Sequence, residues 1–263
     1  MFEAERKQKI LELLKEYNRV DIQGLNRILQ ASESTIRRDL RELEQKNLLK
    51  RTHGGAVALQ NVNFEPTFLE KEISNSGAKK MIAEKAAQFI QEGDVVLLDS
   101  GTTVHYLAKE LKRFTKLTVV TNAIPVAQEL QHHGGVELIF LGGTLRQGVL
   151  SIVGPFAEMM LGMLCVDKAF VATNAIHPQE GLSTPNVEEA SIKRKMIASA
   201  KKTILLADAS KIGEQYLVKF ADVSDIDAFI TDDRASAHML ADFMNQGVVI
   251  HTVSERERLG HLR

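Results

Sequence analysis

Hydrophobic residues recur at two different spacings, and the change of spacing divides the chain into two parts. In the first 58 residues, apolar positions fall three or four apart, as on one face of a helix. From residue 76 onward, short apolar runs alternate with helical patterns, which predicts strands and helices that take turns in a mainly parallel sheet. Residues 59–75 sustain neither spacing and are predicted to be an interdomain linker, with a short helical turn at residues 67–72.

The first part contains three predicted helices with a tight break before the third. The first helix covers residues 5–17, Asp21 is predicted to cap the second, and Ser32 or Ser34 to cap the third. Three short helices in this order are typical of a helix-turn-helix, a DNA-binding unit.

The third helix has two distinct faces. Residues 36, 40 and 43 are apolar and form an inner stripe, whereas another face gathers hydroxyl and guanidinium groups. A helix fits the major groove of DNA, where such groups contact phosphates or base edges. The alternative is a solvated face on a three-helix cap. The predicted DNA-binding residues of this helix are Ser34, Thr35, Arg37, Arg38 and Arg41.

After the third helix, two short strands are predicted around the Gly54-Gly55 turn. The hairpin resembles the wing of a winged helix-turn-helix. Its side chains Lys50, Arg51 and His53 are predicted to contact DNA, although a plain hairpin that closes the small core is the alternative for each.

These motifs together point to a known family. The stretch STIRRDL at residues 34–40, followed by RTHGGA at residues 51–56, resembles the DeoR family of bacterial transcriptional regulators. In that family this helix is the DNA-recognition helix. The resemblance implies a winged helix-turn-helix in residues 1–58 and a sugar-phosphate-sensing α/β domain in residues 76–263.

Polar, glycine-rich turns follow five predicted strands of the second part. Ligands of such folds bind beyond the carboxyl ends of the strands. Backbone amides at a Gly-rich turn and a helix N-terminus attract an anion, and Arg or Lys adds positive charge. The predicted effector-binding residues are Asp99, Ser100, Gly101, Thr102, Thr103, Asn122, Gly142, Gly143, Arg146, Asn174, Asp208 and Lys211.

The same turns resemble the effector domain of the DeoR family, so the resemblance covers about residues 3–252. It implies a fold similar to ribose-5-phosphate isomerase. The isomerase carries an acid/base carboxylate in a stretch that corresponds to the region of Asn174, and an amide does not exchange protons as a general base does. Binding without turnover is therefore favoured, and a sugar-phosphate isomerase with a DNA-binding appendage is the alternative.

Charge at first argues against a nucleic-acid partner, because the whole chain has 33 basic and 34 acidic residues. Residues 1–58, however, contain 12 Lys or Arg and 9 Asp or Glu, so this part carries +3 and the remainder −4. The single cysteine excludes an intramolecular disulfide. No apolar run reaches the roughly 18 residues of a membrane span, and no signal peptide is visible, so a cytoplasmic protein is predicted.

No cofactor or metal site is predicted. The chain lacks the dinucleotide and P-loop fingerprints, and no Cys/His cluster has zinc spacing. Cys165 is predicted to be a buried structural thiol, and the Met-rich run of residues 159–163 to serve packing.

The sequence therefore predicts a DNA-binding transcriptional regulator of a sugar-utilisation operon, with a homodimer or homotetramer on double-stranded operator DNA. A repressor that a phosphorylated sugar or polyol releases from the operator is favoured. An activator that needs the effector in order to bind DNA uses the same parts and is a further alternative.

Overall fold

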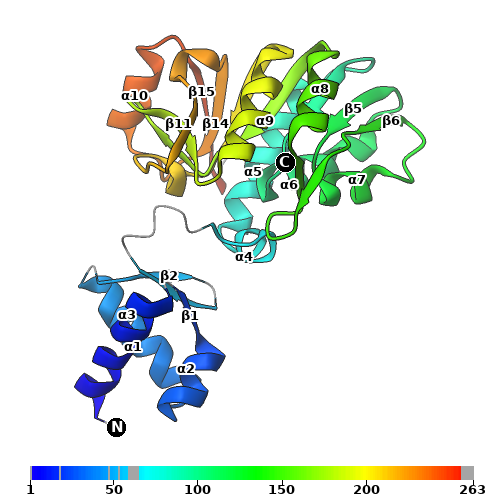
Figure 1. The fold of residues 1–263 in the computed structure, drawn as a ribbon. Helices are drawn as coiled ribbons and strands as arrows, with labels where there is room; N and C mark the ends of the chain where they lie inside the picture. The colour runs from blue at the N-terminus through cyan, green and yellow to red at the C-terminus, as the bar shows by residue number, and fades with distance from the viewer. Residues whose placement is uncertain (1, 18, 47, 53, 59–64, 256–263) are drawn as a thin grey trace. The chain divides into compact units, whose positions relative to one another are not determined.

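The computed structural model describes residues 2–17, 19–46, 48–52, 54–58 and 65–255. Contacts within the chain divide it into two compact units, Met1–Pro66 and Thr67–Arg263 (Figure 1). Each unit has an apolar core of its own, so each is described by itself.

The first unit consists of three helices and a small antiparallel sheet, in which β3 is the middle strand. The three predicted helices and the hairpin are confirmed, whereas β1 was not predicted because three residues are too few to show alternation. The elements are α1 (Glu3–Tyr17), β1 (Arg19–Asp21), α2 (Ile22–Leu29), α3 (Glu33–Gln45), β2 (Lys50–Thr52) and β3 (Gly55–Val57).

Side-chain caps explain where α2 and α3 begin. The carboxylate of Asp21 accepts a hydrogen bond from the Gly24 amide at 2.7 Å, as predicted. Of the two serines considered for α3, Ser32 is the cap, and its hydroxyl accepts a hydrogen bond from the Thr35 amide at 3.2 Å. Ser34 is thereby left in the first turn of α3, with its side chain exposed.

A buried ion pair joins α1 to α3. Arg6 is 8% exposed and Asp39 is fully buried, and their side chains form two hydrogen bonds. The bond to Asp39 raises the pKa of Arg6 above its ordinary value. Asp39, which interrupts the Arg-rich sequence of α3, therefore faces the core beside Ile36 and Leu40 and holds the helix in place.

The second unit is built around a seven-stranded parallel sheet with the order β15-β14-β12-β9-β4-β5-β6. The strand order reverses between β4 and β9, which makes this position the topological switch point. The strands are β4 (Val95–Leu98), β5 (Leu117–Thr121), β6 (Val136–Phe140), β9 (Val166–Ala172), β12 (Ala200–Leu206), β14 (Ala228–Asp232) and β15 (Val249–Val253).

Helices cover both faces of this sheet (Figure 1). Successive strand residues point to opposite faces, so Val96 and Leu98 pack in one layer and Leu97 packs in the other. The predicted α/β architecture is confirmed. One layer holds α5 (Ser76–Ala86), α6 (Thr102–Glu110) and α7 (Ile124–Leu130), and the other holds α8 (Pro155–Gly162), α9 (Val187–Ala198) and α10 (Ala237–Met244).

Several short elements were not predicted. They are β7 (Thr144–Arg146), β8 (Ser151–Val153), β10 (Ala175–His177), β11 (Gly181–Thr184), β13 (Val218–Ala221), α8, and four 3₁₀ turns at Ala87–Phe89, Leu111–Arg113, Ala209–Lys211 and Val223–Asp225. β7 pairs with β8, and β10, β11 and β13 form a second small sheet.

Part of the predicted linker is a helix. A capping box between Thr67 and Glu70 begins α4 (Phe68–Ile73), the first element of the second unit. Phe68 is 7% exposed, and its ring packs edge-on against His105 of α6. Residues 67–75 therefore belong to the second unit and not to a free linker.

One prediction about packing is wrong and another is confirmed only in part. Cys165 is exposed and is not a buried thiol. In the Met-rich run, Leu161 packs in the core and Met160 against it, as predicted, whereas Met159 and Met163 are 59% and 72% exposed. Among the described residues, no helix is both long and apolar enough to span a membrane.

Candidate functional site

The outer face of α3 presents the predicted recognition residues to solvent. Ser34, Arg37, Arg38 and Arg41 are exposed, opposite the buried stripe, and Thr35 is half-buried. Arg37 has one weak partner, Glu33, whose carboxylate lies 3.7 Å from the guanidinium. A pair so exposed is easily exchanged for a phosphate or a base.

Hydroxyl groups gather at the N-terminus of α3. The Ser32 hydroxyl lies 2.9 Å from the Ser34 hydroxyl and 2.8 Å from that of Thr35. The first amides of a helix have no partner within the helix, so this end attracts phosphate oxygens. Hydroxyls, helix N-terminus and three Arg therefore form one continuous polar face.

The predicted DNA-binding residues of the hairpin differ in exposure. Lys50 is exposed, but Arg51 is half-buried and attached to α3: its amide donates to Glu44 at 2.8 Å and its guanidinium lies 3.7 Å from the same carboxylate. Arg51 thus fixes the hairpin to the recognition helix. His53 lies outside the described residues.

In the second unit, a buried ion pair lies at the switch point of the sheet. Asp99 follows β4, and its Oδ2 accepts a hydrogen bond from the Ala172 amide of β9 at 2.9 Å. Lys193 of α9 pairs with the same oxygen and also donates to the Ala172 carbonyl at 3.0 Å. Both charged side chains are almost fully buried, so the pair holds β4, β9 and α9 together.

A second ion pair lies beside it and is connected to several predicted site residues. Arg146 of β7 lies 2.7 Å from Glu189 of α9, and Ser151 donates to this carboxylate at 3.1 Å. Thr184 links Glu189 to Asn174, whose Oδ1 it contacts at 3.0 Å. Arg146 and Asn174, which are 28 positions apart in sequence, therefore meet through Glu189.

The Ser100–Thr103 turn joins β4 to α6. The Ser100 amide donates to Asp99 at 2.7 Å, and Thr102 and Thr103 form the first turn of α6. Gly101 has φ +137°, and a Cβ there would lie 3.1 Å from the Cβ of Ala172. The glycine is therefore required by the backbone, and the turn places the buried residues Thr102 and Thr103 after the carboxyl end of β4.

Asn122 follows β5 and is fully buried. Its Nδ2 donates to the Ile152 carbonyl at 2.9 Å, but its Oδ1 has no hydrogen-bond partner among the described residues. Gly142 and Gly143 are exposed after β6. A Cβ on Gly143 would lie 2.6 Å from the Val153 carbonyl oxygen, so this glycine serves the backbone.

The remaining predicted residues belong to a different polar group. Asp208, after β12, accepts hydrogen bonds from Asn75 at 2.9 Å and from the Ser210 amide at 3.1 Å. Asn75 also accepts one from Arg234 at 3.1 Å. Lys211 ends the 3₁₀ turn that follows Asp208. The predicted effector-binding residues therefore fall into two groups, one near the switch point and one after the carboxyl end of β12.

The segment from α4 to α5 is attached to both groups. The Phe68 amide donates to the Gly148 carbonyl at 2.8 Å, in the turn between β7 and β8. Lys79 of α5 is 4% exposed and donates to the Lys71 carbonyl. Burial lowers the pKa of Lys79 to about 8, although the negative charge of Asp208 acts in the opposite direction and raises it.

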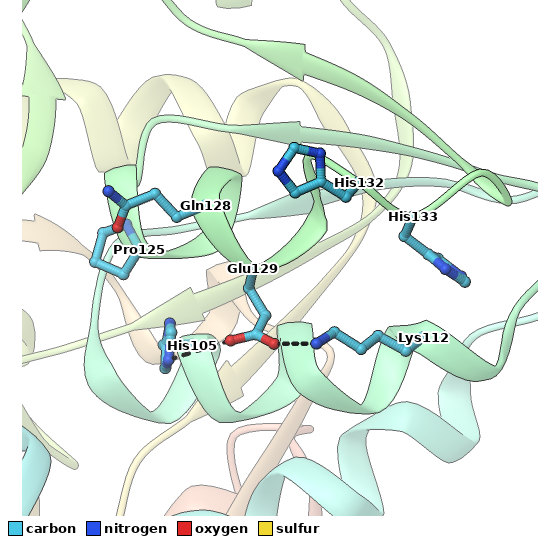
Figure 2. A pocket seen from close by; sticks show the side chains of 7 residues that line it. All are labelled: His105, Lys112, Pro125, Gln128, Glu129, His132 and His133. Atoms are coloured by element: carbon cyan, nitrogen blue, oxygen red, sulfur yellow. Dashed lines mark ion pairs between the residues drawn. The ribbon is translucent and has the colours of Figure 1, made fainter.

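A separate pocket of about 490 Å³ lies between α6 and α7 (Figure 2). Its central carboxylate, Glu129, pairs with Lys112, which lowers the pKa of Glu129, and lies 3.9 Å from His105. Burial lowers the pKa of His105. The pocket contains none of the predicted effector residues, and its lining is His105, Lys112, Pro125, Gln128, Glu129, His132 and His133.

Sequence reasoning missed the cation of the switch-point pair. Lys193 comes from the middle of α9, not from a turn after a strand, and four positions separate it from Glu189. The available signal was that Lys193 lies three positions from both Ala190 and Met196, on the apolar, buried face of α9. Among the described residues, no group of three His, Cys, Asp or Glu side chains is arranged to hold a metal ion.

A winged helix-turn-helix, followed by an α/β unit with a buried polar cluster at its strand ends, defines a class of DNA-binding regulators with a sensor domain. Comparison with protein families agrees: residues 6–62 match the DeoR-like helix-turn-helix domain, and residues 74–233 match the DeoR C terminal sensor domain. The chain belongs to the DeoR family of transcriptional regulators.

Curated relatives cover nearly the whole chain. The HTH-type transcriptional regulator GlpR of Haloferax volcanii is 39% identical over 95% of this chain and 98% of that protein. The HTH-type transcriptional repressor GlcR of Bacillus subtilis is 36% identical over 98% of both chains. The putative aga operon transcriptional repressor of Escherichia coli O157:H7 is 34% identical over 96% of this chain and 94% of that protein. The protein is therefore a DNA-binding transcriptional regulator and not an enzyme.

Among solved structures, ribose 5-phosphate isomerase A from Methanocaldococcus jannaschii is similar over 53% of this chain and 55% of that chain. The TM-score is 0.40 and the sequence identity 16%.

Proposed function

We propose that the protein represses a sugar-utilisation operon in the cytoplasm and that a phosphorylated sugar or polyol releases it from operator DNA. The observation that carries the proposal is the buried polar cluster at the switch point of the sensor sheet, beside the N-terminus of α6. In α/β folds this is where ligands bind. A ligand with both a phosphate and hydroxyls matches the groups found there.

The phosphate is assigned to the Ser100–Thr103 turn. The first turn of α6 supplies backbone amides, two hydroxyls and the positive end of the helix dipole. Arg146 of β7, whose partner Glu189 belongs to the polar cluster at the switch point, is assigned as the cation for the phosphate. Lys211, in the group after β12, is the second predicted cation. Asn122 supports the assignment of sugar hydroxyls, since its buried Oδ1 is ready to accept one.

On the DNA side, α3 is assigned to the major groove, with Arg37, Arg38 and Arg41 on phosphates or guanines. One such head offers few contacts, so we assign operator binding to a homodimer or homotetramer. A dimer reads two half-sites about 10–10.5 base pairs apart, or a multiple of this distance.

Binding of matched ligands tests the sensor. Fructose 1-phosphate, tagatose 6-phosphate and other hexose and hexitol phosphates are screened by calorimetry, each against its unphosphorylated form. A phosphorylated ligand is expected to bind and its unphosphorylated form to bind at least tenfold more weakly, because charged hydrogen bonds contribute roughly 1.5–3 kcal/mol. Equal affinity for both forms contradicts the phosphate site.

A variant localises the ligand that binds. Thr102→Val with Thr103→Val keeps the shape of the turn and removes both hydroxyls, so affinity for the phosphorylated ligand is expected to fall roughly tenfold or more. Thr118→Val, on β5, is the matched control and leaves the affinity unchanged. An unchanged affinity in the double variant places the phosphate elsewhere.

A further inference from the structure

The helix α8 is apolar on two opposite sides. Ala157 and Leu161 are 0% and 1% exposed and pack in the core of the sensor unit. On the other side, Phe156, Met159 and Met163 are 70%, 59% and 72% exposed, at spacings of three and four that align them in one stripe. A helix that is hydrophobic around its circumference is typical of one covered on both sides.

The exposed stripe is also uncharged and large. From residue 155 to residue 165 the only charged side chain is Glu158, which is half-buried. Large side chains offer roughly 200 Å² each, so the three exposed ones present about 400 Å² of apolar surface. This area is at the scale of functional patches and about half of the roughly 800 Å² that each partner contributes to a stable interface. Pro155, Gly162 and Cys165 extend it with further exposed, uncharged surface.

We propose that this α8 face, defined by Phe156, Met159 and Met163, is the surface through which two copies of the chain associate. An uncharged patch does not repel its own copy, and a two-fold contact covers the same patch on both chains at once. DNA is a poor occupant because phosphates need cations, which the face lacks. The choice of a second copy rests on the proposed function, in which one DNA-binding head alone binds weakly.

The α8 face is connected through the β7–β8 hairpin to the buried polar cluster at the switch point. β8 runs directly into α8, and Ser151 of β8 donates to Glu189, the partner of Arg146 on the paired strand β7. A ligand that displaces Glu189 from Arg146 therefore acts on the hairpin that carries α8. This connection gives the effector a physical route to the contact between copies.

Sedimentation of the full chain, without DNA and without sugar phosphate, tests the surface. The wild type is expected to be a dimer or tetramer, and Met159→Glu to weaken its association at least tenfold, because a buried unpaired charge is costly. Met244→Glu is the matched control: Met244 is similarly exposed, at 52%, but lies on α10. It is expected to leave the association unchanged.

Phe156→Ser is a second variant on the same face and is expected to behave as Met159→Glu does. A monomeric wild type, an oligomer that survives both face variants, or equal dissociation by Met244→Glu would each overturn the proposal. A monomeric wild type would contradict both this surface and the oligomer in the proposed function, whereas an oligomer that survives both face variants, or that Met244→Glu dissociates equally, contradicts this surface alone. The sugar-phosphate and DNA measurements are independent of these outcomes, so the two kinds of failure are distinguishable.

Discussion

At the scale of single residues, the sequence distinguishes only partly between side chains available to bind a ligand and side chains that stabilise the fold. The STIRRDL motif contains both kinds. Arg37, Arg38 and Arg41 are exposed, whereas Asp39 is buried against Arg6. Periodicity located the two faces of α3, but the partner of Asp39 comes from α1, 33 positions away, and no local pattern encodes that contact.

Removing the exposed guanidiniums tests the recognition face. Arg37→Ala, Arg38→Ala and Arg41→Ala are each expected to weaken operator affinity by about 1–3 kcal/mol at a base contact, and less at a phosphate. Lys9→Ala, an exposed residue of α1, is the control. Fluorescence anisotropy with a labelled duplex measures the effect at fixed salt, and wild-type affinity in all three variants would show that α3 does not bind DNA.

Burial of Lys79 predicts a pH dependence of stability. Its pKa is about 8 in the folded chain and 10.5 ordinarily, so between these values the unfolded chain binds more protons and stability rises with pH. Lys79→Met removes this contribution. The unfolding free energy of the wild type, relative to the variant, is expected to increase by up to roughly 3 kcal/mol from pH 8 to 10.5. A difference that is constant with pH in calorimetry would contradict it.

At the scale of elements, segments with a clear apolar run, helical spacing or a Gly-Gly turn were predictable, and short segments without such a signal were not. Every strand of the seven-stranded sheet shows an apolar run, but β7, β8, β10, β11 and β13 have only three or four residues. α8 was missed because it is apolar on both sides and so lacks the alternation that marks a helix. Turn residues after strands include Asp99 and Asn174 of the buried polar cluster, whereas Lys193 reaches this cluster from the middle of a helix.

Within the proposed function, we assign transmission of the effector signal to the α4–α5 segment. Asn75, at the junction, bonds Asp208 on one side and Arg234 on the other, and its φ of +53° is a conformation that glycine adopts freely. Asn75→Gly therefore removes both bonds and keeps the backbone. We expect normal affinity for DNA alone and for sugar phosphate alone, but a several-fold smaller effect of one ligand on the other.

The control for this variant is Asn245→Gly, the same substitution after α10. It is expected to keep the full coupling between the two ligands. Anisotropy titrations of DNA binding, with and without saturating sugar phosphate, measure the coupling factor. Full coupling in Asn75→Gly would show that the signal does not pass through this junction.

At the scale of the whole molecule, the net charge of −1 is the sum of a basic first part and an acidic second part. The basic first unit carries the DNA-binding face, and the acidic second unit carries the sensor cluster. Because one head has modest charge, we propose that two heads bind in one assembly, which raises operator affinity. Oligomerisation is thus part of the proposed function, and the exposed face of α8 gives it a location.

Release of the operator by a sugar phosphate is measured directly by titrating the full chain with both ligands. A duplex is selected from a randomised pool by the protein itself, and its affinity is followed by anisotropy while the phosphorylated ligand identified by calorimetry is added. This ligand is expected to lower DNA affinity at least fivefold, and the unphosphorylated sugar is expected to leave it unchanged. DNA affinity that stays constant at saturating ligand, or that increases, would contradict release of a repressor by a sugar phosphate.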